Sequence, residues 1–203
     1  MKKIILSGCL CLLLSALFSQ KLWTQDDRNY LVENLKRTKE ILVKETQGLS
    51  ERQWNFKESP NRWSIKEVVE HVAIWELLLQ ARVSNGMGNG PHPELANIAE
   101  PDSMYLGFIM EEKPHVSVDY TKPFTYTLPM GLNSGQNNMT WFLKMRNESI
   151  EWLKNATEDL RVYQQFPGDK KNLHQVYITI FGHSERHYRQ IMKIKSNPGF
   201  PKE

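Results

Sequence analysis

Four long segments with helical periodicity are the feature that most constrains the fold of this 203-residue chain. In each segment apolar residues recur every three or four positions, which places them on one face of a helix and does not match the alternation of a strand. The sequence shows no internal repeat of fixed period, which argues against a solenoid. We therefore expect an all-α protein, an up-down four-helix bundle. The expected helices cover residues 26–47, 64–83, 136–158 and 172–195.

The second of these helices has the clearest start signal. Ser64 and Glu67 form a capping box, in which each side chain accepts a hydrogen bond from the other residue's free backbone N–H. Trp63 and Val68, which flank the cap, have the spacing of a hydrophobic staple. The helix is expected to end before Asn85-Gly86, because that dipeptide is typical of turns.

A long loop excursion separates the second helix from the third. Residues 84–135 are rich in Gly, Pro and Asn, so they predict little regular structure apart from a short helix near 102–111. Loops of this length inside a compact domain are often the lids or walls of functional sites. Residues 49–63 form the connection between the first two helices.

Three histidines are expected to face the interior of the bundle. At about 100° per residue, His183 and His187 fall one turn apart along the apolar stripe of the last helix. The same projection places His71 among the apolar residues of the second helix. Buried neutral imidazoles need partners for both ring nitrogens, and a shared metal ion would meet that need. The pattern predicts a metal site formed by these three histidines, the alternative being separate hydrogen-bonded core residues.

Other polar residues are expected to lie outside this group. Helical projection turns Glu70 away from the core and Glu185 away from the histidines, and it puts His174 near the charged side of the last helix. His92 and His115 lie in the excursion, where exposure to solvent is expected.

No catalytic residue can be assigned from the sequence. The last helix reads His-Ser-Glu-Arg-His and not His-Glu-x-x-His, so the glutamate base of zincin proteases is missing. Ser184 has no paired base, which argues against a serine nucleophile. Glu67 lies beside His71 in projection, but helix capping is its expected role.

The N-terminal residues have the layout of a secretory signal peptide. Lys2 and Lys3 precede an apolar run from Ile4 to Phe18, which at about 15 residues is short of the roughly 20 that a membrane span needs. We expect residues 1–19 to be removed on export to the periplasm or the medium, leaving a domain over 20–203 with no stable membrane insertion.

Both cysteines lie within this segment, which limits the chemistry of the remaining domain. Cys9 follows residues that imitate a lipoprotein cleavage box, but few apolar residues precede it, so lipid anchoring is less favoured than export. Without cysteines, any metal must be held by His, Asp or Glu. Removal of two lysines lowers Lys+Arg from 26 to 24 against 23 Asp+Glu. The net charge of the remaining domain is then close to neutral and does not indicate binding to nucleic acid.

Four motifs in this order resemble those of the DinB-like (DinB/YfiT) family. They are Trp-Ser-Ile-Lys-Glu-Val-Val-Glu-His at 63–71, Leu-Pro-Met-Gly at 128–131, Phe-Leu-Lys-Met-Arg at 142–146 and His-Ser-Glu-Arg-His-Tyr-Arg-Gln-Ile at 183–191. The resemblance covers about residues 25–195 and implies a four-helix bundle, often a homodimer, that binds a divalent metal ion through three histidines. Position by position these correspond to His71, His183 and His187.

The resemblance leaves three functions open, because family members include thiol S-transferases, metal-dependent hydrolases and proteins without known activity. A thiol transferase needs a reduced thiol pool that is not expected outside the cytosol, so the export signal favours hydrolysis of a small molecule by metal-activated water.

Three imidazoles suit Zn²⁺ or Ni²⁺, with Fe, Mn or Cu as alternatives. The third function is non-catalytic binding of metal or ligand, with residues 84–135 as a wall. Aromatic residues that can line it are Trp75, Tyr105, Phe108 and Trp141, although Trp75 and Trp141 are expected in the core.

Overall fold

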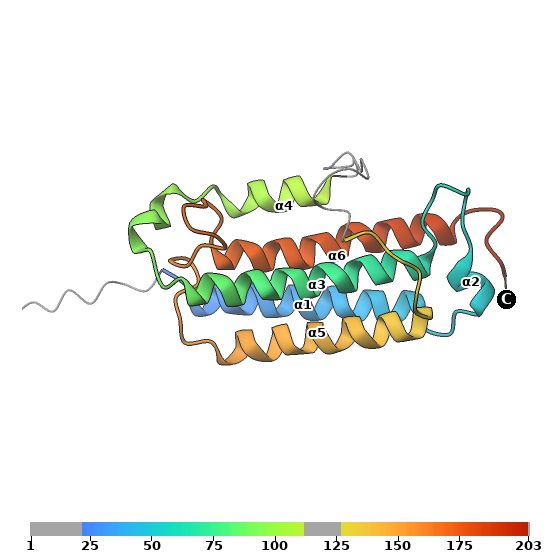
Figure 1. Ribbon diagram of the computed structural model, residues 1–203, viewed down its shortest axis with the longest axis horizontal. Helices are drawn as coiled ribbons and strands as arrows, with labels where there is room; N and C mark the ends of the chain where they lie inside the picture. Colours follow the sequence, from blue (N-terminus) through green and yellow to red (C-terminus); the bar gives the residue numbers. More distant parts are fainter. Residues whose placement is uncertain (1–21, 112–126, 203) are drawn as a thin grey trace, which may run out of the picture.

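The structure is a computed structural model that describes residues 22–111 and 127–202. Its four long helices form a bundle, and a shorter helix lies along the outside of one of them (Figure 1). The all-α four-helix bundle with a long excursion between its second and third helices is thus confirmed. The bundle helices are α1 (Gln25–Thr46), α3 (Ile65–Gly88), α5 (Gly135–Asn155) and α6 (Leu173–Lys195), the outer helix is α4 (Asp102–Met110), and short turns form α2 (Glu51–Asn55) and η1 (Pro93–Ile98).

The order of packing differs from the order of the chain. Helix α1 packs against α5 and α6, and α3 packs against the same two helices, so α1 and α3 lie diagonally across the bundle. Helices α1 and α6 run in one direction and α3 and α5 in the other (Figure 1). An ion pair of 2.7 Å between Glu45 and Lys195 joins the C-terminal turns of α1 and α6. The excursion through α4 returns the chain to the end where α3 begins, which is why α5 runs parallel to α3.

The core is filled by apolar side chains from all four bundle helices. Burial of each such side chain stabilises the fold by about 1.5–3 kcal/mol. One residue from each helix, each at most 1% exposed, illustrates this core: Leu35, Leu79, Leu153 and Val176. No helix within the described ranges is long and apolar enough to cross a membrane. The expected signal peptide lies outside the described residues.

The start of α3 follows the expected capping box. Ser64 N donates to Glu67 Oε2 at 2.8 Å, and Glu67 N donates to Ser64 Oγ at 3.3 Å. The end of α3 differs from the prediction, because the helix continues through Asn85 and Gly86 to Gly88. A Cβ at Gly86 would lie 2.5 Å from the carbonyl oxygen of Gln164. Glycine is therefore used here for close packing of the helix against residue 164 and not to end the helix.

The excursion contains the expected short helix, which covers one side of α6. Helix α4 crosses α6 at Gly182, where a Cβ would lie 2.5 Å from Ile109 Cγ2. This close contact leaves α6 buried almost all round between Asn172 and Ser184. The helix that carries two of the candidate ligands is consequently held on its inner side by the bundle and on its outer side by α4.

Candidate metal centre

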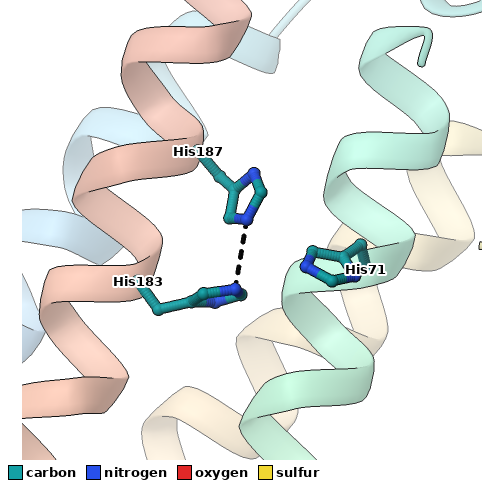
Figure 2. A group of neighbouring side chains, drawn as sticks. All are labelled: His71, His183 and His187. Atoms are coloured by element: carbon teal, nitrogen blue, oxygen red, sulfur yellow. Dashed lines mark hydrogen bonds between the residues drawn. The ribbon is translucent and has the colours of Figure 1, made fainter. Parts of the chain in front are cut away.

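Two antiparallel helices bring the three predicted histidines together. His71 comes from α3, and His183 and His187 come from successive turns of α6. One ring nitrogen from each lies within 4.8 Å of the others, and His183 Nε2 and His187 Nε2 are 3.1 Å apart. Figure 2 shows the three imidazoles pointing into the same space between the helices. All three side chains are buried, with exposed fractions of 5–7%.

Hydrogen bonds fix the orientation of two of the rings. His71 Nδ1 lies 2.6 Å from the carbonyl oxygen of Thr127, which can only accept, so Nδ1 carries the hydrogen and the lone pair is on Nε2. His187 Nδ1 donates in the same way to Gln190 Oε1 at 2.9 Å. Both rings therefore present an unprotonated Nε2 to the shared space. Such bonds from the second ring nitrogen are typical of metal-bound histidines.

The surroundings keep the three imidazoles uncharged near neutral pH. Burial lowers the pKa of His71 to about 4. Burial lowers the pKa of His183 and His187 well below the usual value, and repulsion from the neighbouring imidazoles acts in the same direction. The charge of Arg186 also lowers the pKa of each of the three histidines. Neutral imidazole is the form that binds metal, so the protein needs no proton release to offer these ligands.

The geometry and chemistry of this group fit a divalent transition-metal ion. Two nitrogens bound tetrahedrally to one ion at about 2.0–2.1 Å lie about 3.3 Å apart. The 3.1 Å between His183 Nε2 and His187 Nε2 is close to this separation. Three imidazoles suit Zn²⁺, Ni²⁺ and related ions better than Ca²⁺ or Mg²⁺, which prefer oxygen ligands. Within residues 22–111 and 127–202, the group of potential ligands contains histidines only.

The segment 127–131 supports His71 from outside the bundle. Besides the Thr127 carbonyl on His71, Glu70 Oε1 accepts a hydrogen bond from Met130 N at 3.0 Å and Glu70 Oε2 accepts one from Gly131 N at 2.8 Å. Glu70 is only 3% exposed, so the prediction that it points away from the protein interior was wrong. The reason is that the 127–131 segment folds over this side of α3 and needs an acceptor for its backbone N–H groups.

A buried ion pair fixes α6 next to His183. The guanidinium of Arg146 bonds to both oxygens of Glu76 at 2.8 Å, and its remaining donors reach Leu35 O, Thr38 Oγ1 and Ser184 Oγ. Arg146 is fully buried, and all five of its N–H groups have partners, which is the condition under which a buried charge is tolerated. The hydroxyl of Ser184 thereby has a structural role as a hydrogen-bond partner of Arg146. This agrees with the prediction that Ser184 is not a nucleophile.

The two acidic residues considered beside the histidines are engaged elsewhere. Glu67 bonds to Ser64 N at 2.8 Å and to Lys57 Nζ at 2.7 Å, which confirms its capping role. Glu185 pairs with Arg37 on α1 at 2.6 Å and turns away from the histidines as predicted.

The position of His174 differs from the prediction. Its side chain is 1% exposed, its Nδ1 accepts a hydrogen bond from Trp23 Nε1 at 3.1 Å, and its Nε2 lies 3.3 Å from Asp102 Oδ2. Helical periodicity placed it near a charged face, but Trp23 and the start of α4 cover that face. His92 is 38% exposed and pairs with Glu94, whereas His115 lies outside the described residues.

Two partly buried indole rings flank the histidines. The ring centroid of Trp63 lies 4.8 Å from that of His71, and the centroid of Trp75 lies 5.3 Å from that of His183. Trp75 was expected as a lining residue or core residue, whereas Trp63 was interpreted only as part of the cap. The residues around Trp63 do not predict its contact with His71, because Trp63 precedes α3 and only the tertiary fold brings the two rings together. Trp141 packs against the apolar core, and Phe108 is 56% exposed on α4.

Comparison with known proteins gives one family and one solved structure. The family model described as the DinB superfamily matches residues 34–191, a range that includes all three histidines. The structure of YfiT from Bacillus subtilis is described as "a probable metal-dependent hydrolase with an unusual four-helix bundle topology"; the match covers 88% of this chain and 91% of that chain, with 13% sequence identity and a TM-score of 0.48. No curated protein matches the chain significantly.

Proposed function

The chain belongs to the DinB superfamily, and from this premise we propose that it is a metal-dependent enzyme that hydrolyses a small molecule. The observation that carries the proposal is the convergence of three buried, neutral imidazoles from α3 and α6, with their ring nitrogens within 4.8 Å of one another. Separate core histidines would be satisfied by individual hydrogen bonds and would have no reason to direct one ring nitrogen each at a common point.

The residues of the chain have distinct roles in this proposal. His71, His183 and His187 hold the ion, and three protein ligands leave at least one coordination position for water or substrate. The chemistry that a divalent ion would supply there is a bound water with its pKa lowered to about 7 and polarisation of a substrate carbonyl. Trp63 and Trp75 flank the imidazoles and exclude bulk water from two sides.

The supporting contacts set the ligand geometry. The Thr127 carbonyl holds the Nδ1 hydrogen of His71, so that Nε2 stays available for the ion. Gln190 does the same for His187 from within α6. We propose Zn²⁺ or Ni²⁺ as the ion, because both accept three imidazoles. We also propose that the protein works in the periplasm or outside the cell, on the basis of the charge and apolar pattern of residues 1–19.

Metal analysis is the first test of this proposal. Untagged protein purified without chelator is expected to contain one divalent ion per chain, and His187→Ala is expected to lose it. The matched control is His92→Ala, which should keep the ion. His92 is a partly exposed histidine directly before η1. Wild-type protein without stoichiometric metal would contradict the proposal.

A substrate panel then tests the activity. Ester, amide and lactone substrates are compared with and without chelator, and we expect hydrolysis that the chelator and His187→Ala both abolish. Thiol-dependent loss of an electrophile such as monochlorobimane would instead assign a thiol transferase. Metal binding without turnover of either kind would assign a binding protein. N-terminal sequencing of protein from its native host tests the export proposal independently.

A further inference from the structure

A lysine ammonium lies beside Thr179, the residue one helical turn before His183 on α6. Lys171 Nζ is 3.4 Å from Thr179 Oγ1 and 4.7 Å from the ring centroid of Tyr105 on α4. Thr179 and His183 are four residues apart on α6, so they share one face and are separated by about 6 Å along the axis. The ammonium of Lys171 is thus placed along the same helix face that carries His183.

A second cation reaches the same flank from α3. The guanidinium carbon of Arg82 lies 5.6 Å from the ring centroid of Trp75, and the ring of Trp75 is in turn 5.3 Å from that of His183. Arg82 also lies 5.5 Å from the ring of Phe166. The charge of Arg82 lowers the pKa of Lys171, so the two cations lie close enough to repel each other. Arg82 is connected to the histidine centre through Trp75, which contacts His183, whereas Lys171 contacts Thr179, one helical turn before His183.

Neither cation is neutralised at close range within the described part of the chain. The buried Arg146 and the partly exposed Arg161 each have a carboxylate oxygen within 2.8 Å, but Lys171 and Arg82 have none within 4.0 Å among residues 22–111 and 127–202. Asp169 attracts Lys171, but its carboxylate is bonded to the side chain of Gln165 and to the backbone N–H of Lys171. Burial accordingly lowers the pKa of Lys171.

We propose that Lys171 and Arg82 bind an anionic group, a carboxylate or a phosphate, of the molecule that is processed at the histidine centre. An ammonium and a guanidinium provide several charge-assisted hydrogen bonds to such an oxyanion. The rings of Tyr105 and Trp75 lie beside these cations and provide apolar faces for the rest of the molecule. The link to catalysis rests on the proposed function, whereas anion binding itself does not.

Anion titration tests the proposal directly. Wild-type protein is titrated with inorganic phosphate and, separately, with benzoate at constant ionic strength, and binding is measured by calorimetry and by NMR. Lys171→Met and Arg82→Met are each expected to weaken binding about tenfold or more, because each removes a charge-assisted hydrogen bond. Lys170→Met is the matched control: it removes the same charge from the neighbouring position, where the side chain is 61% exposed, and should leave binding unchanged. A preference for phosphate or for benzoate identifies the anion class.

Three further measurements separate this proposal from the metal proposal. Lys171→Arg should retain binding, and circular dichroism melting should show that all variants are folded. His187→Ala should lose the metal and still bind the anion. If His187→Ala loses anion binding while Lys171→Met retains it, the anion binds the metal and the inference is wrong, although the metal site stands. Equal binding by Lys171→Met and Lys170→Met, or no binding by wild type, would also overturn it.

Discussion

The imidazole Nδ1 of His71 and the carbonyl oxygen of Thr127 are 2.6 Å apart, although 56 residues separate them in the chain. The excursion between α3 and α5 therefore closes back onto the residue of α3 that faces α6. Because a carbonyl oxygen can only accept, this contact selects the tautomer of His71 that leaves Nε2 unprotonated. The neighbouring residue Glu70 holds the same segment through two backbone N–H groups, so the support of His71 depends on α3 itself.

We expect Glu70→Gln to weaken metal binding although it removes no ligand. The amide keeps the size of the side chain but replaces one acceptor with a donor, which opposes the N–H of Met130 or Gly131. Loss of such a supporting contact typically costs about 10- to 100-fold in metal affinity. Competition titration with a chromophoric chelator measures the dissociation constant. Glu67→Gln, three residues earlier on α3, is the control and should change stability but not metal affinity; equal affinities in wild type and Glu70→Gln would contradict the role of Glu70.

Binding of Ni²⁺ or Co²⁺ is expected to quench part of the tryptophan fluorescence. The rings of Trp63 and Trp75 lie 4.8 Å from that of His71 and 5.3 Å from that of His183, so an ion held by these imidazoles would lie close to both indoles, and paramagnetic ions quench nearby indole fluorescence. Trp63→Phe and Trp75→Phe should each reduce the quenched fraction. Trp152→Phe serves as the control, because Trp152 stacks on Tyr177 with a centroid distance of 6.0 Å. Undiminished quenching in both Trp63→Phe and Trp75→Phe would place the bound ion elsewhere.

Loss of the buried cation should destabilise the bundle strongly. Arg146→Met leaves Glu76 buried without its partner, and breaking a buried ion pair on one side costs about 3–5 kcal/mol of the free energy of unfolding. The double variant Glu76→Leu/Arg146→Met removes both charges and should recover a large part of this loss. Urea unfolding followed by circular dichroism measures both. A double variant no more stable than Arg146→Met would show that packing, and not the uncompensated charge, causes the loss.

Acid should release the start of α4 from the bundle. Burial of Asp102 is outweighed by its hydrogen bonds to His174 and Arg161, which hold the pKa of this carboxyl below its usual range. A depressed carboxyl pKa contributes stability that is complete above the unfolded value of about 3.9 and is lost as the pH falls below it. Asp102→Asn should therefore lower the free energy of unfolding at pH 7 by about 1–2 kcal/mol, discounted for partial exposure.

The pH dependence provides the check on Asp102. The difference in stability between wild type and Asp102→Asn should shrink as the pH falls from 5 to 3, measured by urea unfolding at each pH. Asp26→Asn, an exposed carboxylate in the first turn of α1, should show no comparable change. A constant difference between wild type and Asp102→Asn across this range would exclude the proposed ion-pair contribution.

The sequence by itself determined the features that depend on a single helix. The four-residue spacing of His183 and His187 places both on one face whatever surrounds the helix, and the apolar neighbours of His71 turn it inward. The capping box of Ser64 and Glu67 is likewise complete within four residues, so the start of α3 was predictable. The family motifs then added that these two helices meet.

Only the tertiary structure decided what covers each helix face. Glu70 is buried because the 127–131 segment, some 60 residues later, supplies N–H groups for its carboxylate. His174 is buried because Trp23, 151 residues earlier, and Asp102 on α4 both reach it. Gly86 stays within α3 because residue 164 packs against it. Helical periodicity states which residues share a face, but whether that face meets solvent or another segment is set by contacts between residues far apart in the chain, which leave no local pattern.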